Sequence, residues 1–463
     1  MNEIYVRDIV KVCDGKLISG SENFICENFS NDTRRINPGD VYIGIKGEKF
    51  DGSLFWKEAL EKGAGCIMVQ GIEISRETIE RFPDRAIILV EDTLIAIQKL
   101  AAYKRSLYNI PVIAITGSVG KTSTKDLVSS VVAQKYRCLK TEGNYNNHIG
   151  VPLTLLRLKN EEVAVIEMGM NHFGEISLLT NIVKPTIAII TNIGTAHIGN
   201  LGSREHILKA KLEILEGLAE NGTIIINQDN DLLEKWYEQV ENKENIRTYG
   251  IKSDCELKAY DVNITEKGSS YKIKIREQEY EIKVPISGEP FVYNSLCSLA
   301  VADVLEIPME QSKEGIKTFE LTKKRMDIEE LRCGVTVIND SYNASLDSVK
   351  AGLEYLRMYK GNKKIAVLGD MLELGEFSKQ LHCEVGEAVV QEKIDKLIAV
   401  GSFAKYIVEE AERKGMSTKN IYLCATNEEA AKILQTQMNE GDVILLKAAN
   451  AMKFSEILEK IRS

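Results

Sequence analysis

The sequence predicts an α/β protein of three domains, and two observations lead to that prediction. The first is length, because 463 residues exceed what one hydrophobic core usually supports and suggest about three domains. The second is a set of short, continuous apolar runs that alternate with helical segments along the chain. Runs of this kind are typical of parallel strands that helices cover on both faces. We place the domains at residues 1–103, 104–320 and 321–463.

The expected elements follow this alternation from one end of the chain to the other. The first domain combines short strands at 40–45 and 65–69 with glycine-rich turns, and a helix near 94–105 follows them. The central and C-terminal domains each contain a series of parallel strands, and the C-terminal series is Rossmann-like. The strands expected in these two series are 111–116, 163–168, 186–191, 223–226, 335–338, 365–368, 397–400 and 443–446.

Two stretches depart from this alternation. Between Leu257 and Val284 apolar residues recur at every second position, for example at Tyr271 and Ile273. A period of two predicts an antiparallel meander with one exposed face. The segment 318–324 is polar and charged and lies between two apolar series, so we expect a hinge there.

Composition excludes several classes of protein. The formal net charge of −9 reflects 68 acidic against 59 basic residues, which argues against a nucleic-acid-binding or membrane-surface protein. The densest basic run, Lys323-Lys324-Arg325, is too short to follow a phosphate backbone. Nine cysteines are scattered without a CxxC pair, which predicts neither a zinc site nor a disulfide framework. Without a signal-peptide pattern or a membrane-spanning apolar run, we expect a cytoplasmic protein with no membrane insertion and no nucleic-acid partner.

A phosphate-binding loop is predicted at residues 116–123, Thr-Gly-Ser-Val-Gly-Lys-Thr-Ser, directly after a strand and at the start of a helix. Gly117 and Gly120 allow a tight turn that aims backbone N–H groups at phosphate oxygens. Lys121 supplies a positive charge for the terminal phosphates, and the hydroxyl of Thr122 can bind Mg²⁺. The longer GxxxxGK[ST] pattern fails because Ile115 stands at its first glycine, so the match is to the shorter GxxGK[ST] form.

A carboxylate and a histidine follow the next strands. Glu167 ends the run 163–166, and ligands of parallel sheets bind beyond the carboxyl ends of strands, so this carboxylate is placed to meet an ATP-bound metal. A solvated residue at a strand end is the alternative. His197 lies in the turn after the strand 186–191. A metal ligand and a structural histidine are equally compatible with that position.

Lys211 lies inside an apolar stripe of its helix, four residues after Ile207 and four before Leu215. Residues at this spacing share one helix face. The side chain either reaches outward to solvent or is held where water is scarce. In the second case desolvation lowers the pKa of the amine. A neutral amine can capture CO₂ as a carbamate, which would replace a cation by a carboxylate-like metal ligand.

Longer runs of residues resemble the Mur ligase family over essentially the whole chain. These runs are 30–40 with Gly47 and Asp51-Gly52, 142–150, 167–176, and 368–375 with His382 and Gly386. The runs at 167–176 and 368–375 are most similar to the family member that adds D-alanyl-D-alanine to a UDP-N-acetylmuramoyl-tripeptide. The chain departs from the family pattern at Cys297, where asparagine is usual, and at 447–450, where Lys-Ala-Ala-Asn replaces Lys-Gly-Ser-Arg.

The resemblance implies a UDP-binding N-terminal domain, a central ATPase domain and a C-terminal ligase domain, with ATP and Mg²⁺ as cofactors. The implied ATP-binding residues are Gly117, Ser118, Val119, Gly120, Lys121, Thr122, Ser123, Asn294, Arg325 and Asp340. The implied catalytic residues are Lys121, Glu167, His197 and Lys211, and the implied metal ligands are Thr122, Glu167, His197 and Lys211 as a carbamate. The implied UDP-substrate residues are Ser30, Thr33, Arg34, Lys46, Asn144 and Asn147.

The implied reaction is ATP-dependent formation of an amide bond through an acyl phosphate, for peptidoglycan precursor synthesis, by a monomer. Another Mur-type ligase is one alternative, disfavoured by the runs at 167–176 and 368–375. A ligase like folylpolyglutamate synthase is a second, but its phosphate loop lies near the N-terminus, whereas about 110 residues precede this one. A non-catalytic nucleotide-binding paralogue is a third, and it would be expected to lose Lys121, Glu167 or Lys211.

Overall fold

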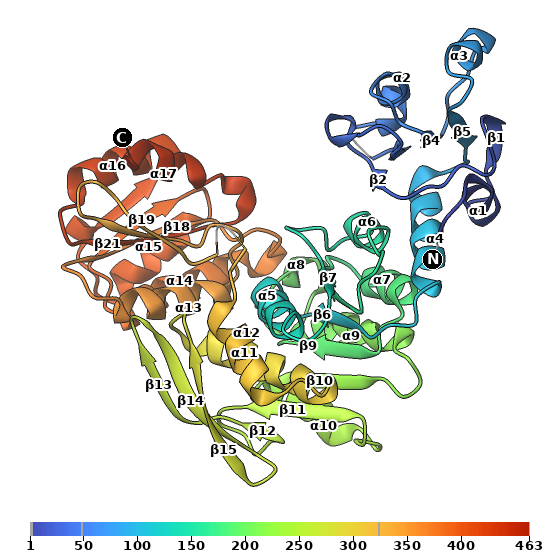
Figure 1. Cartoon of the computed structure of the whole chain (residues 1–463). Coiled ribbons are helices and arrows are strands. Elements are labelled where there is room, and N and C mark those ends of the chain that lie inside the picture. Colours follow the sequence, from blue (N-terminus) through green and yellow to red (C-terminus); the bar gives the residue numbers. More distant parts are fainter. Residues whose placement is uncertain (1–2, 48–49, 323–324, 463) are drawn as a thin grey trace. The chain divides into compact units, whose positions relative to one another are not determined.

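The computed structural model describes residues 3–47, 50–322 and 325–462, and Figure 1 shows its elements. Two members of the basic run, Lys323 and Lys324, and with them part of the expected hinge, lie outside the described residues. By proximity of Cα atoms the chain divides into two compact units, Met1–Ile115 with Tyr136–Ala188 and Leu212–Gly222, and Thr116–Lys135 with Ile189–Lys211 and Thr223–Ser463. Among the described residues, no helix is both long and apolar enough to cross a membrane.

The N-terminal region folds around a five-stranded sheet in the order β1-β5-β4-β3-β2. Only β1 and β5 pair antiparallel. Tyr42, Trp56, Leu60 and Ile67 pack into its core, because the apolar strands bury both faces. The elements are α1 Val6–Val12, β1 Lys16–Ser19, β2 Phe29–Ser30, η1 Thr33–Arg35, β3 Val41–Ile43, η2 Gly52–Phe55, α2 Trp56–Glu61, β4 Cys66–Val69, α3 Arg76–Arg81, β5 Ala86–Leu89 and α4 Thr93–Ser106.

The central sheet has seven strands in the order β12-β11-β10-β9-β6-β8-β7. Its pairs β6–β8, β7–β8, β10–β11 and β11–β12 are parallel, as the apolar runs predict. The elements are β6 Val112–Thr116, α5 Lys121–Val132, β7 Cys138–Lys140, α6 Gly150–Leu155, β8 Val163–Glu167, α7 Glu175–Val183, β9 Ile187–Ile190, α8 Ile198–Leu201, α9 Arg204–Leu212, η3 Glu213–Gly217, β10 Thr223–Asn227, α10 Asp231–Gln239, β11 Ile246–Gly250, β12 Leu257–Lys258, α11 Glu289–Val304 and α12 Met309–Thr318.

The predicted meander is confirmed with one correction. Strands β13 Tyr260–Thr265, β14 Gly268–Ile275 and β15 Gln278–Val284 form an antiparallel three-stranded sheet. Tyr271 and Ile273 are buried, and the lysines between and beside them are not, which is the alternation that a period of two requires. Leu257 does not belong to this sheet, because β12 pairs with β11 instead.

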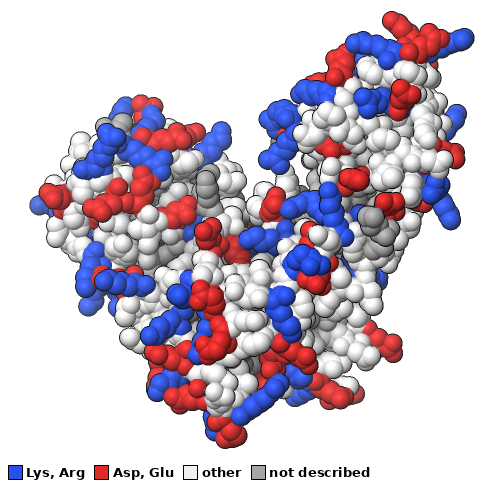
Figure 2. All heavy atoms as spheres, viewed as in Figure 1, with Lys and Arg blue, Asp and Glu red and all other residues white. Residues whose placement is uncertain are grey.

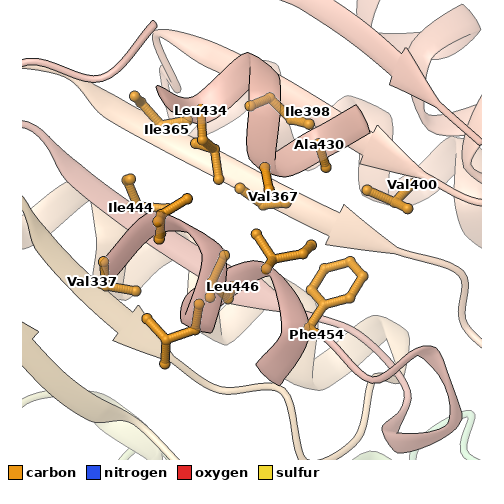
Figure 3. Packing of buried hydrophobic residues seen from close by; sticks show 14 of the residues in the cluster. Val337, Ile365, Val367, Ile398, Val400, Ala430, Leu434, Ile444, Leu446 and Phe454 are labelled. Atoms are coloured by element: carbon orange, nitrogen blue, oxygen red, sulfur yellow. The ribbon is translucent and has the colours of Figure 1, made fainter. Parts of the chain in front are cut away.

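The C-terminal region contains a six-stranded sheet in the order β16-β17-β21-β18-β19-β20, in which only β16 runs antiparallel. Helices α16 and α17 pack on one face, where Val367, Leu446 and Phe454 meet in the core (Figure 3). The elements are β16 Asp327–Glu330, β17 Thr336–Asn339, α13 Leu346–Met358, β18 Lys364–Gly369, η4 Gly375–Phe377, α14 Ser378–Gln391, β19 Lys396–Val400, α15 Ala404–Arg413, η5 Thr418–Asn420, β20 Ile421–Cys424, α16 Asn427–Gln437, β21 Val443–Lys447, η6 Asn450–Met452 and α17 Ser455–Arg462.

The surface carries both signs of charge. Figure 2 shows lysine and arginine side chains interspersed with aspartate and glutamate over the viewed face. Many of these side chains form ion pairs one helical turn apart or between neighbouring elements. Such exposed pairs contribute little stability, typically about 0.2–1 kcal/mol each. Their distribution agrees with the weak net acidity of the composition.

Candidate nucleotide site

The predicted phosphate loop connects β6 to α5. Gly117 has φ +153° and Gly120 has φ +81°, conformations that residues with a side chain rarely adopt. A side chain at Gly117 would also collide with the hydroxyl of Thr191. Gly120 precedes α5 as its N-cap without a side-chain cap, so the first N–H groups of the helix are available to a phosphate oxygen.

The segment after β9 holds this loop in place. Asn192 accepts a hydrogen bond from the Ser118 N–H at its carbonyl (3.0 Å) and another from the Val119 N–H at its side-chain oxygen (2.9 Å). Thr191 donates from its hydroxyl to the Val119 carbonyl at 2.7 Å, and the Gly194 N–H donates to the Ser118 hydroxyl at 2.9 Å. The sequence motif does not reveal these supporting hydrogen bonds, because their partners lie about 70 positions away in the chain.

Lys121 and Thr122 open α5 within reach of the loop. The ammonium of Lys121 donates to the Gly117 carbonyl at 2.8 Å, so it folds back over the loop. Thr122 is fully buried, and its hydroxyl accepts a hydrogen bond from Nη2 of Arg325 at 2.8 Å. The guanidinium of Arg325 stacks 4.1 Å from the ring centre of Tyr342. The structure therefore brings Arg325, predicted to bind nucleotide, directly to the phosphate loop.

Two other predicted nucleotide residues have partners within the protein. Asn294 of α11 is buried and accepts a hydrogen bond at Oδ1 from the hydroxyl of Thr124 at 3.0 Å, which attaches it to α5 close to Gly120. Asp340 forms an ion pair with Lys447, whose ammonium also donates to a neighbouring backbone carbonyl at 2.9 Å. Lys447 begins the Lys-Ala-Ala-Asn stretch that departs from the family pattern.

Lys211 is buried, with 1% of its surface exposed, so the alternative that it reaches out to solvent is wrong. Desolvation lowers the pKa of its amine well below the ordinary value, and the nearby charge of Lys121 lowers that pKa further. Within the described ranges, Lys211 makes neither a hydrogen bond nor an ion pair. The stripe that contains it is not one continuous α-helix, because α9 ends at Leu212 and continues as the 3₁₀-helix η3.

His197 lies at the N-cap of α8 in the left-handed region, with φ 64°. Its Nδ1 pairs with a carboxylate oxygen of Glu373, which also has a left-handed backbone, with φ 61°. The backbones of the two segments approach closely here: the Gly199 N–H donates to the Glu373 carbonyl at 3.0 Å. A side chain at Gly199 would collide with the Gly375 backbone. This contact between residues 197–199 and 373–375, the glycine seam, leaves Nε2 of His197 for another partner.

Glu167 lies in the first of the two compact units. It ends β8, is 1% exposed, and accepts a hydrogen bond at Oε1 from Nδ2 of Asn146 at 2.8 Å. Its N–H donates to the hydroxyl of Thr141 at 3.0 Å. A buried carboxylate oriented by an amide has the character expected of a metal ligand with a supporting outer shell. Asn146 was missed by the sequence reasoning, although it lies in the family-like run 142–150.

The predicted UDP-substrate residues also lie in the first unit, where most have local partners. Arg34 is exposed and forms a two-pronged ion pair with Asp32, whose pKa is lowered to about 2, chiefly by this guanidinium. The Ser30 hydroxyl donates to the Asp32 carbonyl, and the Thr33 hydroxyl donates to Glu58. The Lys46 ammonium lies 3.9 Å from a carboxylate oxygen of Asp51. Asn144 is exposed, and the side chain of Asn147 accepts from the N–H groups at the start of α6.

The donors present fit a magnesium ion that is shared with phosphate groups. In the part of the chain that the structure describes, no three histidine, cysteine, aspartate or glutamate side chains gather into a metal cage. Mg²⁺ usually keeps several waters and binds one or two protein oxygens together with substrate phosphates. The hydroxyl of Thr122 already accepts from a cationic group, and the partnerless amine of Lys211 would gain an anionic oxygen donor as a carbamate.

Comparison with known proteins agrees with this site. Three family models match the chain: Mur ligase family, catalytic domain, at 27–105, Mur ligase middle domain at 115–302, and Mur ligase, glutamate ligase domain, at 324–450. The UDP-N-acetylmuramoyl-tripeptide–D-alanyl-D-alanine ligase of Bacillus subtilis is 36% identical, over 98% of each chain.

Two crystal structures are similar over nearly their whole length. MurF from Acinetobacter baumannii has a TM-score of 0.88 and 28% identity, over 99% of each chain. The MurF ligase from Thermotoga maritima in complex with ADP has a TM-score of 0.80 and 29% identity, over 94% of this chain and 97% of that one. The chain therefore belongs to the Mur ligase family and has its α/β architecture of three domains.

Proposed function

We propose that this chain joins D-alanyl-D-alanine to the tripeptide of a UDP-N-acetylmuramoyl-tripeptide, with conversion of ATP to ADP and phosphate, in peptidoglycan precursor synthesis. The full-length relatives that carry this activity in their names support the substrates. The single observation that supports the chemistry is the convergence of Lys121 and Arg325 on the phosphate loop. Two cations from distant parts of the sequence meet where a transferring phosphate would carry its charge.

The reaction needs activation because a carboxylate oxygen is a poor leaving group. The terminal carboxylate of the tripeptide attacks the γ-phosphorus of ATP, the bond to the β-phosphate oxygen breaks, and ADP leaves. The amine of D-alanyl-D-alanine then attacks the acyl phosphate, the C–O bond to phosphate breaks, and the ammonium loses its proton as the amide forms. Catalysis of phosphoryl transfer rests mainly on positioning and charge neutralisation.

Each residue of the nucleotide site has a separate role in this proposal. The N–H groups of Gly117–Ser123 surround the phosphates, and Lys121 exchanges the Gly117 carbonyl for a phosphate oxygen. Arg325 moves from the Thr122 hydroxyl toward the γ-phosphate. Asn294 contacts the adenine, and Asp340 contacts the nucleotide from the C-terminal side.

We assign the magnesium ion to the hydroxyl of Thr122, the carboxylate of Glu167, Nε2 of His197 and a carbamate on Lys211. When bound, Mg²⁺ neutralises charge on the β- and γ-phosphates. The carbamate forms when the neutral amine of Lys211 attacks CO₂: an N–C bond forms and one proton is released. The support for it is an amine that is 1% exposed and has no partner among the described residues.

The precursor would bind through Ser30, Thr33, Arg34 and Lys46 of the N-terminal domain and through Asn144 and Asn147 of the central domain. Arg34 and Lys46 are exposed cations suited to a diphosphate. We further infer a cytoplasmic monomer, with domains close to 1–103, 104–320 and 321–463.

Phosphate release and product mass test the proposal directly. With ATP, Mg²⁺ and the UDP-linked tripeptide, the purified protein should release phosphate only when D-alanyl-D-alanine is added. The UDP-linked tripeptide should then gain the mass of D-alanyl-D-alanine less one water. Activity with a UDP-linked dipeptide and a free diamino acid would instead assign another Mur-type reaction. Activity with a folate and glutamate would assign the folylpolyglutamate type.

A further inference from the structure

One face of α5 is contacted twice by the segment that leads into the C-terminal domain. Thr122 and Asp126 lie four residues apart, so their side chains share this face. Arg325 donates to the Thr122 hydroxyl at 2.8 Å. One turn further along the helix, Oδ2 of Asp126 accepts from the N–H of Thr322 at 3.0 Å and from its hydroxyl at 2.9 Å. Thr322 and Arg325 thus contact successive turns of α5, and the Arg325 contact lies nearer the phosphate loop.

The anchoring carboxylate is itself held by a buried ion pair. The ammonium of Lys125 lies 2.9 Å from Oδ1 of Asp126, and the two side chains are 1% and 2% exposed. A buried ion pair offsets its desolvation only when its geometry is good and its remaining hydrogen-bonding positions are filled. Thr322 fills the position at Oδ2. The pair therefore holds one oxygen of Asp126 toward Lys125 and the other toward the connecting segment.

A fixed Thr322 limits where Arg325 can go. Consecutive residues extend by at most about 3.6 Å each, so three residues span no more than about 11 Å. With Thr322 attached one turn from Thr122, the backbone of Arg325 stays near the first turns of α5, from which its guanidinium reaches the Thr122 hydroxyl. Without that attachment, the same side chain would range over a larger volume and would meet a phosphate less often.

We propose that Asp126 and Thr322 are positioning residues, which anchor the connecting segment on α5 and thereby deliver Arg325 to the γ-phosphate. This inference rests on the proposed ligase function. It also refines the expected hinge at 318–324, because Thr322 itself is attached to α5 by two hydrogen bonds.

The first test removes one of the two bonds from the connecting segment. Thr322→Val keeps the shape of the half-buried side chain and the backbone N–H bond to Asp126, but its side chain has no hydroxyl to donate. We expect kcat to fall about tenfold, the effect of losing a hydrogen bond to a charged group, while ADP affinity by calorimetry stays unchanged. Thr322→Ser should restore kcat. Glu320→Gln is the matched control, because Glu320 is exposed two residues away, and it should behave like the unaltered protein.

A double-mutant cycle separates positioning from general support. In an Arg325→Ala background, Thr322→Val should lower kcat by less than about twofold, because the group to be positioned is gone. An equal loss in both backgrounds would overturn the proposal, as would an unchanged kcat in Thr322→Val alone.

A readout without turnover keeps the anchor testable even if the ligase assay fails. Replacing the pair together, with Lys125→Met and Asp126→Leu, substitutes apolar side chains of similar volume, which proteins often tolerate. The Thr322 amide should then exchange with deuterium at least about tenfold faster than in Glu320→Gln. An equally slow amide in a folded double variant would refute the anchor. Fast exchange in the double variant, together with an unaltered protein that shows no ligase activity, would leave the anchor standing and refute the proposed function.

Discussion

Two junctions between a parallel strand and a helix N-terminus in this molecule have opposite chemistry. At the first, β6 leads through Gly117 and Gly120 into α5, whose N-cap has no side chain to offer. At the second, α15 begins beside the end of β18, and the N–H groups of Ser402, Phe403 and Ala404 donate to the carboxylate of Asp370 at 3.0, 3.1 and 2.7 Å.

The difference shows that the residue next to the start of the helix decides whether a parallel sheet has a free anion-binding site. Helix N-termini attract negative charge, and both junctions lie at the carboxyl ends of parallel strands. In the C-terminal domain the protein supplies the anion itself, since Asp370 is buried and occupies the N–H groups that a phosphate would need. In the central domain Gly120 leaves them to a ligand. The Rossmann-like appearance of the C-terminal sheet therefore does not make it a second nucleotide site.

The largest expected effect is at the open junction. Lys121→Ala should lower kcat about a thousandfold or more, because a charge that stabilises the transition state is lost in a site shielded from water. Thermal stability should change little. Affinity for the UDP-linked tripeptide, measured by calorimetry, should survive. Loss of precursor binding together with activity would contradict the division of work between domains.

Lys211→Ala should also be nearly inactive, with a loss of at least about a hundredfold in kcat. Short carboxylic acids added to the assay should recover part of the activity by supplying the oxygens of the carbamate. Lys121→Ala is the control, since no carboxylate should rescue it. A crystal of the active, nucleotide-bound protein at neutral pH with an unmodified Lys211 would exclude the carbamate.

Asp370→Ala should destabilise the capped junction while sparing the open one. The N–H groups of Ser402, Phe403 and Ala404, at and just before the start of α15, would lose their acceptor, at a cost of about 2 kcal/mol. Denaturant unfolding should report this loss, and ADP affinity of the folded protein should remain unchanged. A second ADP bound by Asp370→Ala would be informative, because it would show that the carboxylate alone excludes nucleotide from this domain.

The smallest expected effect concerns stability and pH. In the unfolded chain, Lys211 binds a proton at any pH below its ordinary pKa of 10.5. In the folded chain it stays neutral to a lower pH, because burial lowers its pKa. Stability should therefore fall as pH falls below that value. In CO₂-free buffer at pH 7, Lys211→Met should raise Tm by at least about 2 °C. The gain should shrink toward pH 10, and a pH-independent gain would point to packing instead.

Local chemistry was predictable from the sequence, and partnerships across the chain were not. The phosphate loop was found because Gly117, Gly120 and Lys121 are neighbours along the chain. Asn192 supports the phosphate loop from about 70 residues away, and Asp126 contacts Thr322 about 200 residues away. No local sequence pattern encodes contacts between such distant positions. Lys211 illustrates the limit, since its spacing allowed two orientations and only packing distinguishes them.

Strands were missed at the edges of sheets, as with β16 and β20, and inside them, as with β5 and β11. β16 has no buried residue and no apolar run, whereas β20 is an apolar sequence with one buried residue of four. The antiparallel pairing of β1 with β5 was not predicted either. The predicted domain boundaries stay predictions, and so do the ligand roles of Glu167, His197 and the UDP-substrate residues.

The glycine seam has a consequence for how this protein can vary. Gly199 and Gly375 pack backbone against backbone, and a methyl group on Gly375 would stand 3.1 Å from the Gly199 Cα. Neither position can gain a side chain unless the other segment moves, and that movement would separate His197 from Glu373. In an alignment of relatives, we expect these two positions to change together or not at all, with His197 and Glu373 following them as a linked set.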